Sequence, residues 1–498
     1  MPSNTPPVNT AAMEPLPPPP ERSGEDVAAS RRVAWTPEVA WRAGRVVLGG
    51  SPWAVTVIPE SMREFTQRAF AAGSSGITPA TDTEKQAARL LLDRGIVHPL
   101  PEPAAAVTDV EIVIPVYGDA APLERCLASL ADEGLPITVV DDASPEPHAT
   151  KIAALAEAHG ARLIRHDTNL GPGGARNTGM AATTAPFVAF IDDDAYATPG
   201  WIAKLRPILD DERVGAVGPR VRPGLKGTSA IELYEETRSE LDMGPLPSKV
   251  VHGVAVGWLP SAAVLVRRAA TSTPPFEPGL RVGEDVDLFW RMDETGWTVL
   301  YAPHVVVYHE VRLSWRDFSG RRAMYGSSAA PLELRHPGRL TPASPHVSGL
   351  AALVALATKR PLIAGAIGVY EVARYRAMLG PRVPLRVVIE VAARSMWSDA
   401  YWTGHLLRRD WWPIGWSALA LAPRSRIARG FAAAMLWQPV RDHLLRPTRL
   451  DPARSLAMRL LDDASYGGGV IRNAIRYRVA NVVRPRPRFP SWPKRRLR

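Results

Sequence analysis

Three consecutive aspartates, Asp192, Asp193 and Asp194, are the residues whose type and spacing most directly indicate chemistry. They follow the apolar run 185–191, which predicts a buried β-strand, so the acids lie where that strand leaves the core. In an extended backbone Asp192 and Asp194 point to the same side, an arrangement that suits a hard divalent cation bridging to phosphate. A solvated, aspartate-rich turn is the alternative, and three acids alone do not decide between the two.

The elements that must position these acids alternate between strand and helix from residue 107 onward. Strands and helices are predicted at 110–116, 122–132, 137–140, 151–159, 162–165 and 187–191, and a further helix opens at the glycine-rich loop 169–174. This alternation predicts an α/β fold with a largely parallel sheet, whose ligand site lies at the carboxyl ends of the strands. Asp142 and Asp192 both fall at such ends.

The chain before this region has two parts. Residues 1–30 are rich in proline, lack the features of a signal peptide and are expected to be disordered. Residues 31–103 predict a small winged-helix-like module, with two strands around the turn 49–52 and helices at 59–72 and 83–94. The module resembles the peptide-recognition domains of ribosomal-peptide modification systems. DNA binding is the rival function, but the segment is not markedly basic, so no nucleic acid partner is expected.

Residues 341–483 are rich in alanine, leucine and arginine and predict a helical extension. Tryptophans such as Trp397 and Trp416 occur among the arginines. This composition permits two interpretations, a bundle that covers the preceding domain or helices that lie on a membrane surface. The apolar stretches 349–357 and 362–369 are shorter than the roughly 18 to 20 residues that a bilayer span needs.

The distribution of charge and the cysteine content indicate the cellular compartment and a basic C-terminal segment. The chain carries 60 Lys and Arg against 50 Asp and Glu, and ten of the bases, with no acid, lie from residue 471 onward. The body is therefore neutral, and residues 484–498 form a basic tail that is expected to be disordered. The single cysteine, Cys126, is spaced for core packing and indicates a reducing, cytoplasmic setting. Peripheral contact with the inner face of the membrane is the further hypothesis.

Five short motifs resemble glycosyltransferase family 2, whose members use nucleotide sugars and have the GT-A fold. In order they are Ile112-Val113-Ile114-Pro115-Val116-Tyr117, Val139-Val140-Asp141-Asp142-Ala143-Ser144, Gly174-Ala175-Arg176-Asn177, Asp192-Asp193-Asp194 and Gly283-Glu284-Asp285-Val286-Asp287-Leu288. Each is weak alone, but the five in this order make the resemblance strong, and it implies a GT-A domain over residues 104–340. The Gln-x-x-Arg-Trp motif of processive membrane synthases is absent after residue 310, so a pore-forming synthase is not expected.

The resemblance assigns a donor site for a UDP-sugar. Asp142 would accept a hydrogen bond from uracil, and Pro115 and Tyr117, at the end of the first strand, would flank the base. Simple packing is the alternative for Tyr117. Arg176 follows the glycine-rich loop at a helix start, which favours contact with phosphate, and a surface ion pair is its alternative.

The resemblance also implies that the acidic cluster holds Mg²⁺ or Mn²⁺ beside the diphosphate. Asp194 would be the direct ligand and Asp192 would lie near both the metal and the ribose, with Asp193 a further donor-side residue. Several branches of the family use a histidine after the base helix as third ligand. This favours His309, at the end of an apolar strand, over His304, and a structural histidine is the alternative.

On the acceptor side, Asp285 matches the catalytic base of the family. Glu284 would shape the acceptor pocket, and such a paired acid can raise the pKa of a base toward neutrality. A helix start is the structural explanation for both acids, and the two explanations are compatible. Trp258 lies where the family places acceptor-side loop residues, and a buried tryptophan is the competing interpretation.

The order of parts resembles the glycosyltransferases of mycofactocin systems. This implies inverting transfer of glucose from UDP-glucose onto the peptide-derived precursor of the redox cofactor mycofactocin, which builds a β-linked oligoglucoside. One alternative is a rhamnosyl- or galactosyltransferase of cell-wall or lipid-linked glycan. The other is a sugar-nucleotide-binding protein without activity, which the complete set Asp142, Asp194 and Asp285 argues against.

Overall fold

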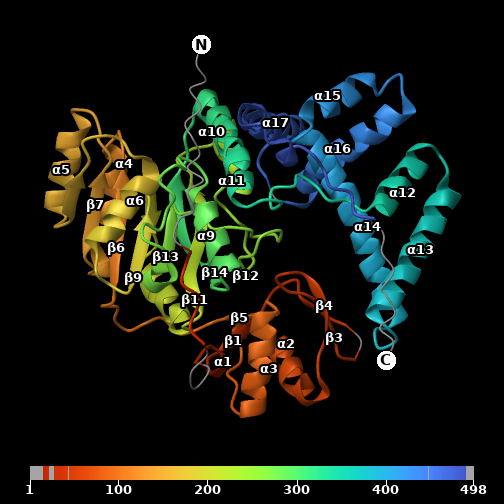
Figure 1. Cartoon of the computed structure of the whole chain (residues 1–498), viewed down its shortest axis with the longest axis horizontal. Helices are drawn as coiled ribbons and strands as arrows, with labels where there is room; N and C mark the ends of the chain where they lie inside the picture. The colour runs from red at the N-terminus through yellow and green to blue at the C-terminus, as the bar shows by residue number, and fades with distance from the viewer. Residues whose placement is uncertain (1–14, 22–26, 43, 447, 490–498) are drawn as a thin grey trace. The chain divides into compact units, whose positions relative to one another are not determined.

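The computed structural model (Figure 1) describes residues 15–21, 27–42, 44–446 and 448–489. Their contacts divide them into two compact units: a sheet unit within residues 7–226 and 238–311, and a helical unit within residues 227–237 and 312–498. The residues with predicted chemistry, from Pro115 to His309, all lie in the sheet unit.

The sheet unit is built on one mixed β-sheet, of which nine strands are described. Eight run in the order β10-β14-β11-β13-β9-β6-β7-β8, and β12 pairs with β14. Their bounds are β6 Val110–Val116, β7 Ile137–Asp141, β8 Arg162–Arg165, β9 Phe187–Ile191, β10 Ala195–Ala197, β11 Val214–Gly224, β12 Ser248–Lys249, β13 Ala263–Arg267 and β14 Thr298–Glu310. From β8 to β9 the neighbours are parallel, whereas β13 is antiparallel to β9 and β11. The α/β prediction is confirmed, and the sheet is mixed beyond β9.

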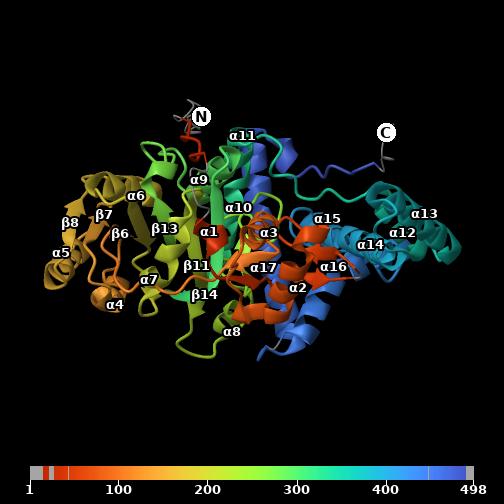
Figure 2. The same ribbon diagram turned by 90° about the horizontal axis from the view of Figure 1, so that it is seen from below.

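Helices cover both faces of this sheet (Figure 2). Their bounds are α4 Ala121–Leu130, α5 His148–Ala158, α6 Gly171–Ala182, α7 Trp201–Leu205 and α9 Glu284–Glu294. Because side chains alternate along a strand, Ile112 and Ile114 of β6 share a core with α4 and α7, whereas Val113 shares one with α6 and α9. Cys126 is buried in the first core, as its spacing predicts. These two cores fix the strand ends that carry the predicted acids.

The module before the sheet has its own small core, which includes Trp35, Phe65 and Leu91. Its elements are α1 Val27–Ser30, β1 Val33–Trp35, β2 Ala40–Trp41, β3 Val46–Gly49, β4 Ala54–Val57, α2 Arg63–Ala72, α3 Asp82–Asp93 and β5 Val97–Pro99. The strands β2, β3 and β4 form one antiparallel sheet, and β1 pairs with β5. The two strands predicted around the turn and the two predicted helices are all present.

The chain is attached to the sheet unit on both sides of this module. Before it, Leu16 is buried in the core under α9, and the Trp297 indole N–H donates to the Pro17 carbonyl oxygen at 2.6 Å. After it, the Ala104 N–H donates to the Ala203 carbonyl at 2.8 Å. Residues 15–21 thus differ from the expected disorder of residues 1–30, because one apolar side chain in a stiff proline run can dock at little entropic cost. Residues 1–14 and 22–26 lie outside the described residues.

The helical unit contains α8 Ala230–Arg238, α10 Trp315–Ser327, α11 Ala329–Arg335, α12 Val347–Ala357, α13 Pro361–Leu379, α14 Leu385–Arg408, α15 Trp412–Leu421, α16 Arg426–Leu445 and α17 Pro452–Tyr477. In the described part of the chain, no helix is long and apolar enough to cross a membrane. The basic segment is ordered as far as it is described, since the N–H groups of Arg486 and Arg488 donate to the carbonyls of Ala343 and Pro345. Residues 490–498 of the predicted tail lie outside the described residues.

Helix α17 passes so close to the end of α14 that only glycine fits at one position. A Cβ on Gly467 would lie 1.8 Å from the Arg409 carbonyl oxygen, whereas a Cβ on Gly468 would meet nothing within 4 Å. We expect Gly467→Ala to lower the free energy of unfolding by about 1–3 kcal/mol, because the two helices must separate. The matched change Gly468→Ala should raise it by about 0.5–1 kcal/mol through helix propensity. Urea denaturation of both variants measures this, and equal effects would contradict the close approach.

Candidate active site

Arg176, in α6, joins two acids that lie far apart in the sequence. Its guanidinium is 3% exposed, with Nη1 donating to Glu284 Oε1 at 2.8 Å and Nη2 donating to Asp192 Oδ1 at 2.5 Å. Arg176 Nε is also buried and has no partner among the described residues. The structure therefore places Arg176 in a buried ion pair rather than at the surface.

Asp194 and His309 face each other across the pairing of β10 with β14. In that register Ala195, next to Asp194, lies opposite His309, and His309 Nε2 is 2.8 Å from Asp194 Oδ1. Ligand atoms of Asp192, Asp194 and His309 all lie within 4.8 Å of one another. The structure thus brings together the three residues predicted to hold a metal.

The hydrogen bonding of His309 fixes its tautomer. His309 Nδ1 lies 3.0 Å from the Glu310 carbonyl oxygen, which can only accept, so Nδ1 carries a proton. A neutral ring then presents the Nε2 lone pair toward Asp194. A lone pair and a carboxylate at 2.8 Å repel unless a proton or a cation lies between them. An imidazole oriented by a backbone carbonyl beside two carboxylates is a donor set that fits a divalent cation.

Asp193 is surrounded by charge of its own sign. Desolvation, Asp194 and Asp192 together raise the pKa of Asp193 well above its ordinary value, and His309 acts in the opposite direction. Carboxylates crowded in this way are the usual electrostatic setting for a bound cation.

Asp142, at the end of β7, is 3% exposed and ties that strand to the start of α6. Its carboxylate accepts hydrogen bonds from the N–H groups of Leu170 and Gly171, each at 2.8 Å. His166 Nδ1 lies 2.8 Å from the same carboxylate, and His166 Nε2 lies 2.9 Å from Thr178 Oγ1. Asp142 therefore holds the loop that opens α6. Sequence reasoning missed His166, which no motif or spacing signals.

Pro115 and Tyr117 stand at the end of β6 in different environments. Pro115 is buried within the strand, whereas Tyr117 is 58% exposed. Simple packing is therefore not the explanation for Tyr117, since more than half of its surface is open to solvent. An exposed ring at a strand end is available to stack on a planar base.

Asp285 and Glu284 lie in the first turn of α9. Asp285 accepts hydrogen bonds from the N–H of Val286 at 2.8 Å and from the N–H of Ser261 at 3.3 Å, which orients its carboxylate. Desolvation raises the pKa of Asp285 above its usual range, and Arg176 opposes this shift. Desolvation and the Asp285 charge raise the pKa of Glu284 to about 7, again against Arg176. A shifted carboxyl pair of this kind is typical of acid–base chemistry.

The loop before β13 connects the two sides of the site. The Ser261 N–H donates to Asp285, and the Ala262 carbonyl accepts from the Asp192 N–H at 3.0 Å. Trp258, on the same loop, is half-buried, which leaves part of its ring available to a sugar. Sequence reasoning missed Ser261, because it contributes through its backbone and no residue-type pattern reveals that.

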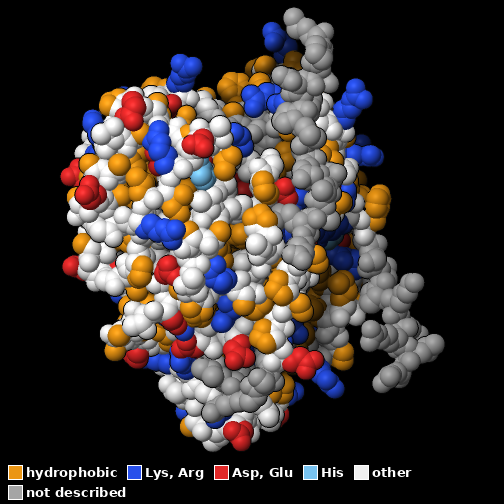
Figure 3. Space-filling model, turned by 60° about the vertical axis from the view of Figure 1, so that its left-hand side comes forward, with side chains coloured by type: hydrophobic (Ala, Val, Ile, Leu, Met, Phe, Trp, Pro, Cys, Tyr) orange, Lys and Arg blue, Asp and Glu red, His pale blue; other side chains and the backbone are white. Residues whose placement is uncertain are grey.

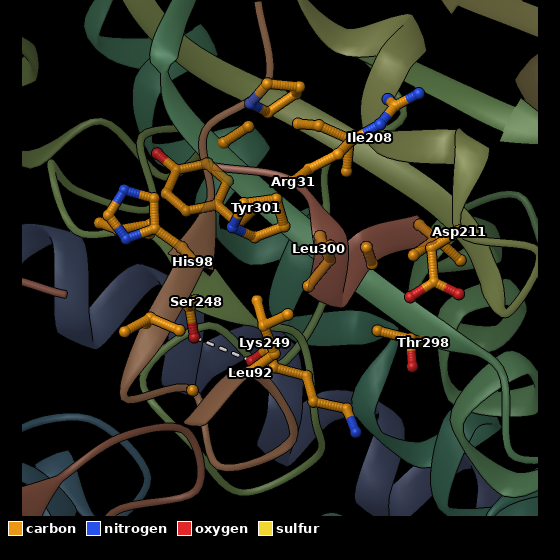
Figure 4. A pocket seen from close by; sticks show the side chains of 18 of the residues that line it. Arg31, Leu92, His98, Ile208, Asp211, Ser248, Lys249, Thr298, Leu300 and Tyr301 are labelled. Carbon is orange, nitrogen blue, oxygen red and sulfur yellow. Dashed lines mark hydrogen bonds between the residues drawn. The ribbon is translucent and has the colours of Figure 1, made fainter. Parts of the chain in front are cut away.

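A separate cavity of about 60 Å³ lies between the module and the sheet (Figure 4). Leu92 and His98 of the module and Leu300 and Tyr301 of β14 contribute to its wall. Desolvation and the nearby His304 lower the pKa of His98 to about 4, so this imidazole is neutral at physiological pH. The cavity contains none of the predicted donor, acceptor or metal residues, and it accounts for His304 as part of the contact with the module.

Comparison with known proteins identifies the family. Residues 111–259 match the model described as Glycosyl transferase family 2, and residues 187–438 match Glycosyl transferase family group 2. Over 457 residues the chain is 32% identical to Pre-mycofactocin glycosyltransferase of Mycobacterium tuberculosis (strain ATCC 25618 / H37Rv), which covers 89% of this chain and 95% of that protein. The chain belongs to glycosyltransferase family 2.

Two further proteins are similar to parts of this chain. Succinoglycan biosynthesis protein ExoO of Rhizobium meliloti (strain 1021) is 31% identical over 195 residues, which is 36% of this chain and 54% of that protein. Mannosyltransferase PcManGT from Pyrobaculum calidifontis, solved in complex with GDP-Man and Mn²⁺, is 16% identical, with a TM-score of 0.41 over 75% of this chain and 89% of that chain. The protein is a glycosyltransferase with a GT-A domain.

Arg176 should set the pH at which this glycosyltransferase becomes active. Arg176 lowers the pKa of both Glu284 and Asp285, so Arg176→Met should raise both. A base works only when deprotonated, so the ascending limb of the pH–rate profile of sugar transfer should move up by about one pH unit or more. The pH of this limb does not depend on the fraction of enzyme that is folded. Arg281→Met is the control: it replaces an exposed arginine that is hydrogen-bonded to Asn169, and the limb should lie at the same pH as in the unmodified enzyme. An unchanged limb in Arg176→Met would contradict the effect of Arg176 on the two pKa values.

Proposed function

We propose that the protein is a metal-dependent, inverting glucosyltransferase that uses UDP-glucose to glucosylate the peptide-derived precursor of mycofactocin, building a β-linked oligoglucoside. The observation that carries the acceptor is the similarity to Pre-mycofactocin glycosyltransferase over 95% of that protein. A match over 89% of this chain cannot be confined to the GT-A domain, so it includes most of the module and of the helical unit. The single cysteine fits a reducing, cytoplasmic setting for this reaction.

Asp285 is the proposed catalytic base. Inversion requires a base that takes the proton from the acceptor hydroxyl while the sugar is attacked from the face opposite the leaving diphosphate. The two backbone N–H groups that bind the Asp285 carboxylate hold it in one orientation, and desolvation raises its pKa toward the operating pH. Glu284, with a pKa of about 7 and a hydrogen bond from Arg176, is proposed to shape the acceptor pocket together with Trp258.

Asp142, Pro115, Tyr117 and Arg176 form the proposed donor site. The Asp142 carboxylate has lone pairs beyond those its loop partners use, so it can accept the N–H of uracil without losing the loop. The exposed Tyr117 ring can cover the base, and buried Pro115 restricts the backbone conformation at the end of the strand. Arg176 holds Asp192 in place next to the diphosphate, and Asp193 adds to the local negative charge.

Asp194, Asp192 and His309 are the residues proposed to hold Mg²⁺ or Mn²⁺. A bound divalent cation would neutralise the charge of the leaving diphosphate. The chain itself orients these ligands. The Glu310 carbonyl oxygen holds the His309 ring, and the Arg176 guanidinium holds the Asp192 carboxylate.

Cation binding distinguishes His309 from the other histidine of β14. In calorimetric titrations with Mn²⁺ alone, we expect Asp194→Asn and His309→Gln to weaken binding by at least about tenfold, because each removes a ligand. His304→Gln should bind Mn²⁺ like the unmodified protein, since His304 lines the separate cavity. Unchanged affinity in both ligand variants would refute the metal site.

The module is proposed to bind the acceptor peptide. In the described chain β2 and β4 are the edge strands of its three-stranded sheet, and Trp53 and Val57, beside or in β4, are 46% and 40% exposed. An extended peptide can add to such an edge by main-chain hydrogen bonds, while exposed apolar side chains supply specificity.

A second candidate function is transfer of rhamnose or galactose to a lipid-linked glycan. The large apolar side chains exposed on the helical unit favour it, because they suit a lipid-borne acceptor. A sugar-nucleotide-binding protein without activity is disfavoured by the intact set Asp142, Asp194 and Asp285.

Mass spectrometry separates these functions. The enzyme is incubated with UDP-glucose and Mn²⁺ and either the peptide-derived precursor or a lipid-linked glycan, and we expect hexose additions on the peptide-derived acceptor. Asp285→Asn should abolish turnover, a loss of at least about 10³-fold, while UDP still binds. Asp293→Asn, at the other end of α9, should keep activity. Sugar on the lipid-linked glycan alone would overturn the acceptor, and an active Asp285→Asn variant would overturn the base.

A further inference from the structure

Helix α13 presents its apolar side chains outward and its charges inward. Leu362 is 88% exposed and Val369 is 71% exposed. On the same helix Glu371 and Arg374 are 2% and 4% exposed, and Arg374 Nη2 is 2.6 Å from Glu371 Oε2. A helix of a water-soluble protein normally has the opposite arrangement, so the outward face of α13 is built for an apolar environment.

The same property extends over α12 to α16. Exposed tryptophans occur at 397 and 402 on α14, 416 on α15 and 437 on α16, each between 45% and 51% exposed. Between α12 and α13 lies an apolar groove of about 580 Å³, whose wall includes Leu362, Ile367 and Tyr370. Together these features far exceed the scattered apolar residues of an ordinary surface. Indole rings at this density are typical of the boundary between lipid and water.

The charged side chains of this segment distinguish a lipid surface from a second copy of the protein. Among the described residues from 347 to 446, ten Lys or Arg side chains are exposed and no Asp or Glu is. The acids of this segment are buried, apart from the partly buried Glu390, which pairs with Arg394 at 3.0 Å. On the face of the molecule drawn in Figure 3, by contrast, acidic and basic side chains are interspersed. A second copy of this surface would bring like charges together, whereas an anionic lipid surface is complementary to it.

We propose that helices α12 to α16 form a docking surface for an anionic lipid bilayer and lie in its interface. None of the described helices can span a membrane, so they lie along the surface with Leu362, Val369 and the tryptophans inserted among the lipids. The exposed arginines, such as Arg424, Arg426 and Arg429 around the start of α16, contact the lipid headgroups. The inference is independent of donor and acceptor identity, because it rests on the helical unit alone.

Vesicle sedimentation of the full-length protein tests the docking surface. The protein should bind vesicles of equimolar phosphatidylcholine and phosphatidylglycerol, and bind pure phosphatidylcholine vesicles far less. The triple variant R424Q/R426Q/R429Q should lose on the order of a hundredfold in partitioning, about fivefold for each charge. The double variant L362S/V369S should lose at least about tenfold. Ile475→Ser, on α17 and 74% exposed, is the matched control and should partition normally.

Circular dichroism should show that the variants are folded, because the changed side chains are exposed. Absence of binding to anionic vesicles, or equal binding to neutral ones, would overturn the proposal. Sedimentation velocity gives a further test. If the unmodified protein is a dimer and the triple and double variants are both monomers, the proposal is overturned and the surface is an interface with a second copy. If the unmodified protein binds anionic vesicles but transfers no sugar, the proposed function is refuted and the proposed docking surface is still supported.

Discussion

The site depends on the buried positive charge of Arg176. Asp192, Glu284 and Asp285 would repel one another, and Arg176 is the guanidinium that lowers the pKa of both Glu284 and Asp285 and hydrogen-bonds Asp192. A buried pair of this kind adds little net stability, because desolvation of both partners offsets their attraction. What it contributes is position, since it holds the end of β9 against the start of α9.

This bridge also divides the site by charge. Asp192 and Asp194 come together with His309, and both carboxylates raise the pKa of Asp193, so this part of the site has the concentrated negative charge that suits a metal. At the start of α9 desolvation raises the pKa of Glu284 and Asp285, which suits proton transfer. Under the proposed function, Arg176 would therefore stand between the residues that hold the cation and those that accept the proton.

Much of the sheet and of the site could be predicted from the sequence, because short-range patterns encode them. The strands 110–116 and 187–191 are apolar runs with clear ends, and the acids follow them directly. The partnership of Arg176 and Glu284 could not be predicted, since they are 108 residues apart and no local pattern links them. Leu16 is a single apolar residue in a proline run, without the periodicity that predicts burial. The inverted face of α13 lies within one helix, but burial of Glu371 becomes visible only in three dimensions.

The attachment of the chain on both sides of the module limits how that module can move. Leu16 and Pro17 bind the sheet unit before it, and Ala104 binds the sheet unit after it, so residues between them form a closed loop. A domain tethered at one end can sweep a large volume, whereas a module attached at both ends and also packed on the sheet, as by the Arg89–Asp211 ion pair at 3.2 Å, moves over a smaller range. Under the proposed function, a peptide bound to the module would reach Asp285 through its own length and flexibility. The distance that the acceptor covers, and with it the number of sugars added before release, would then depend on the peptide rather than on movement of the module.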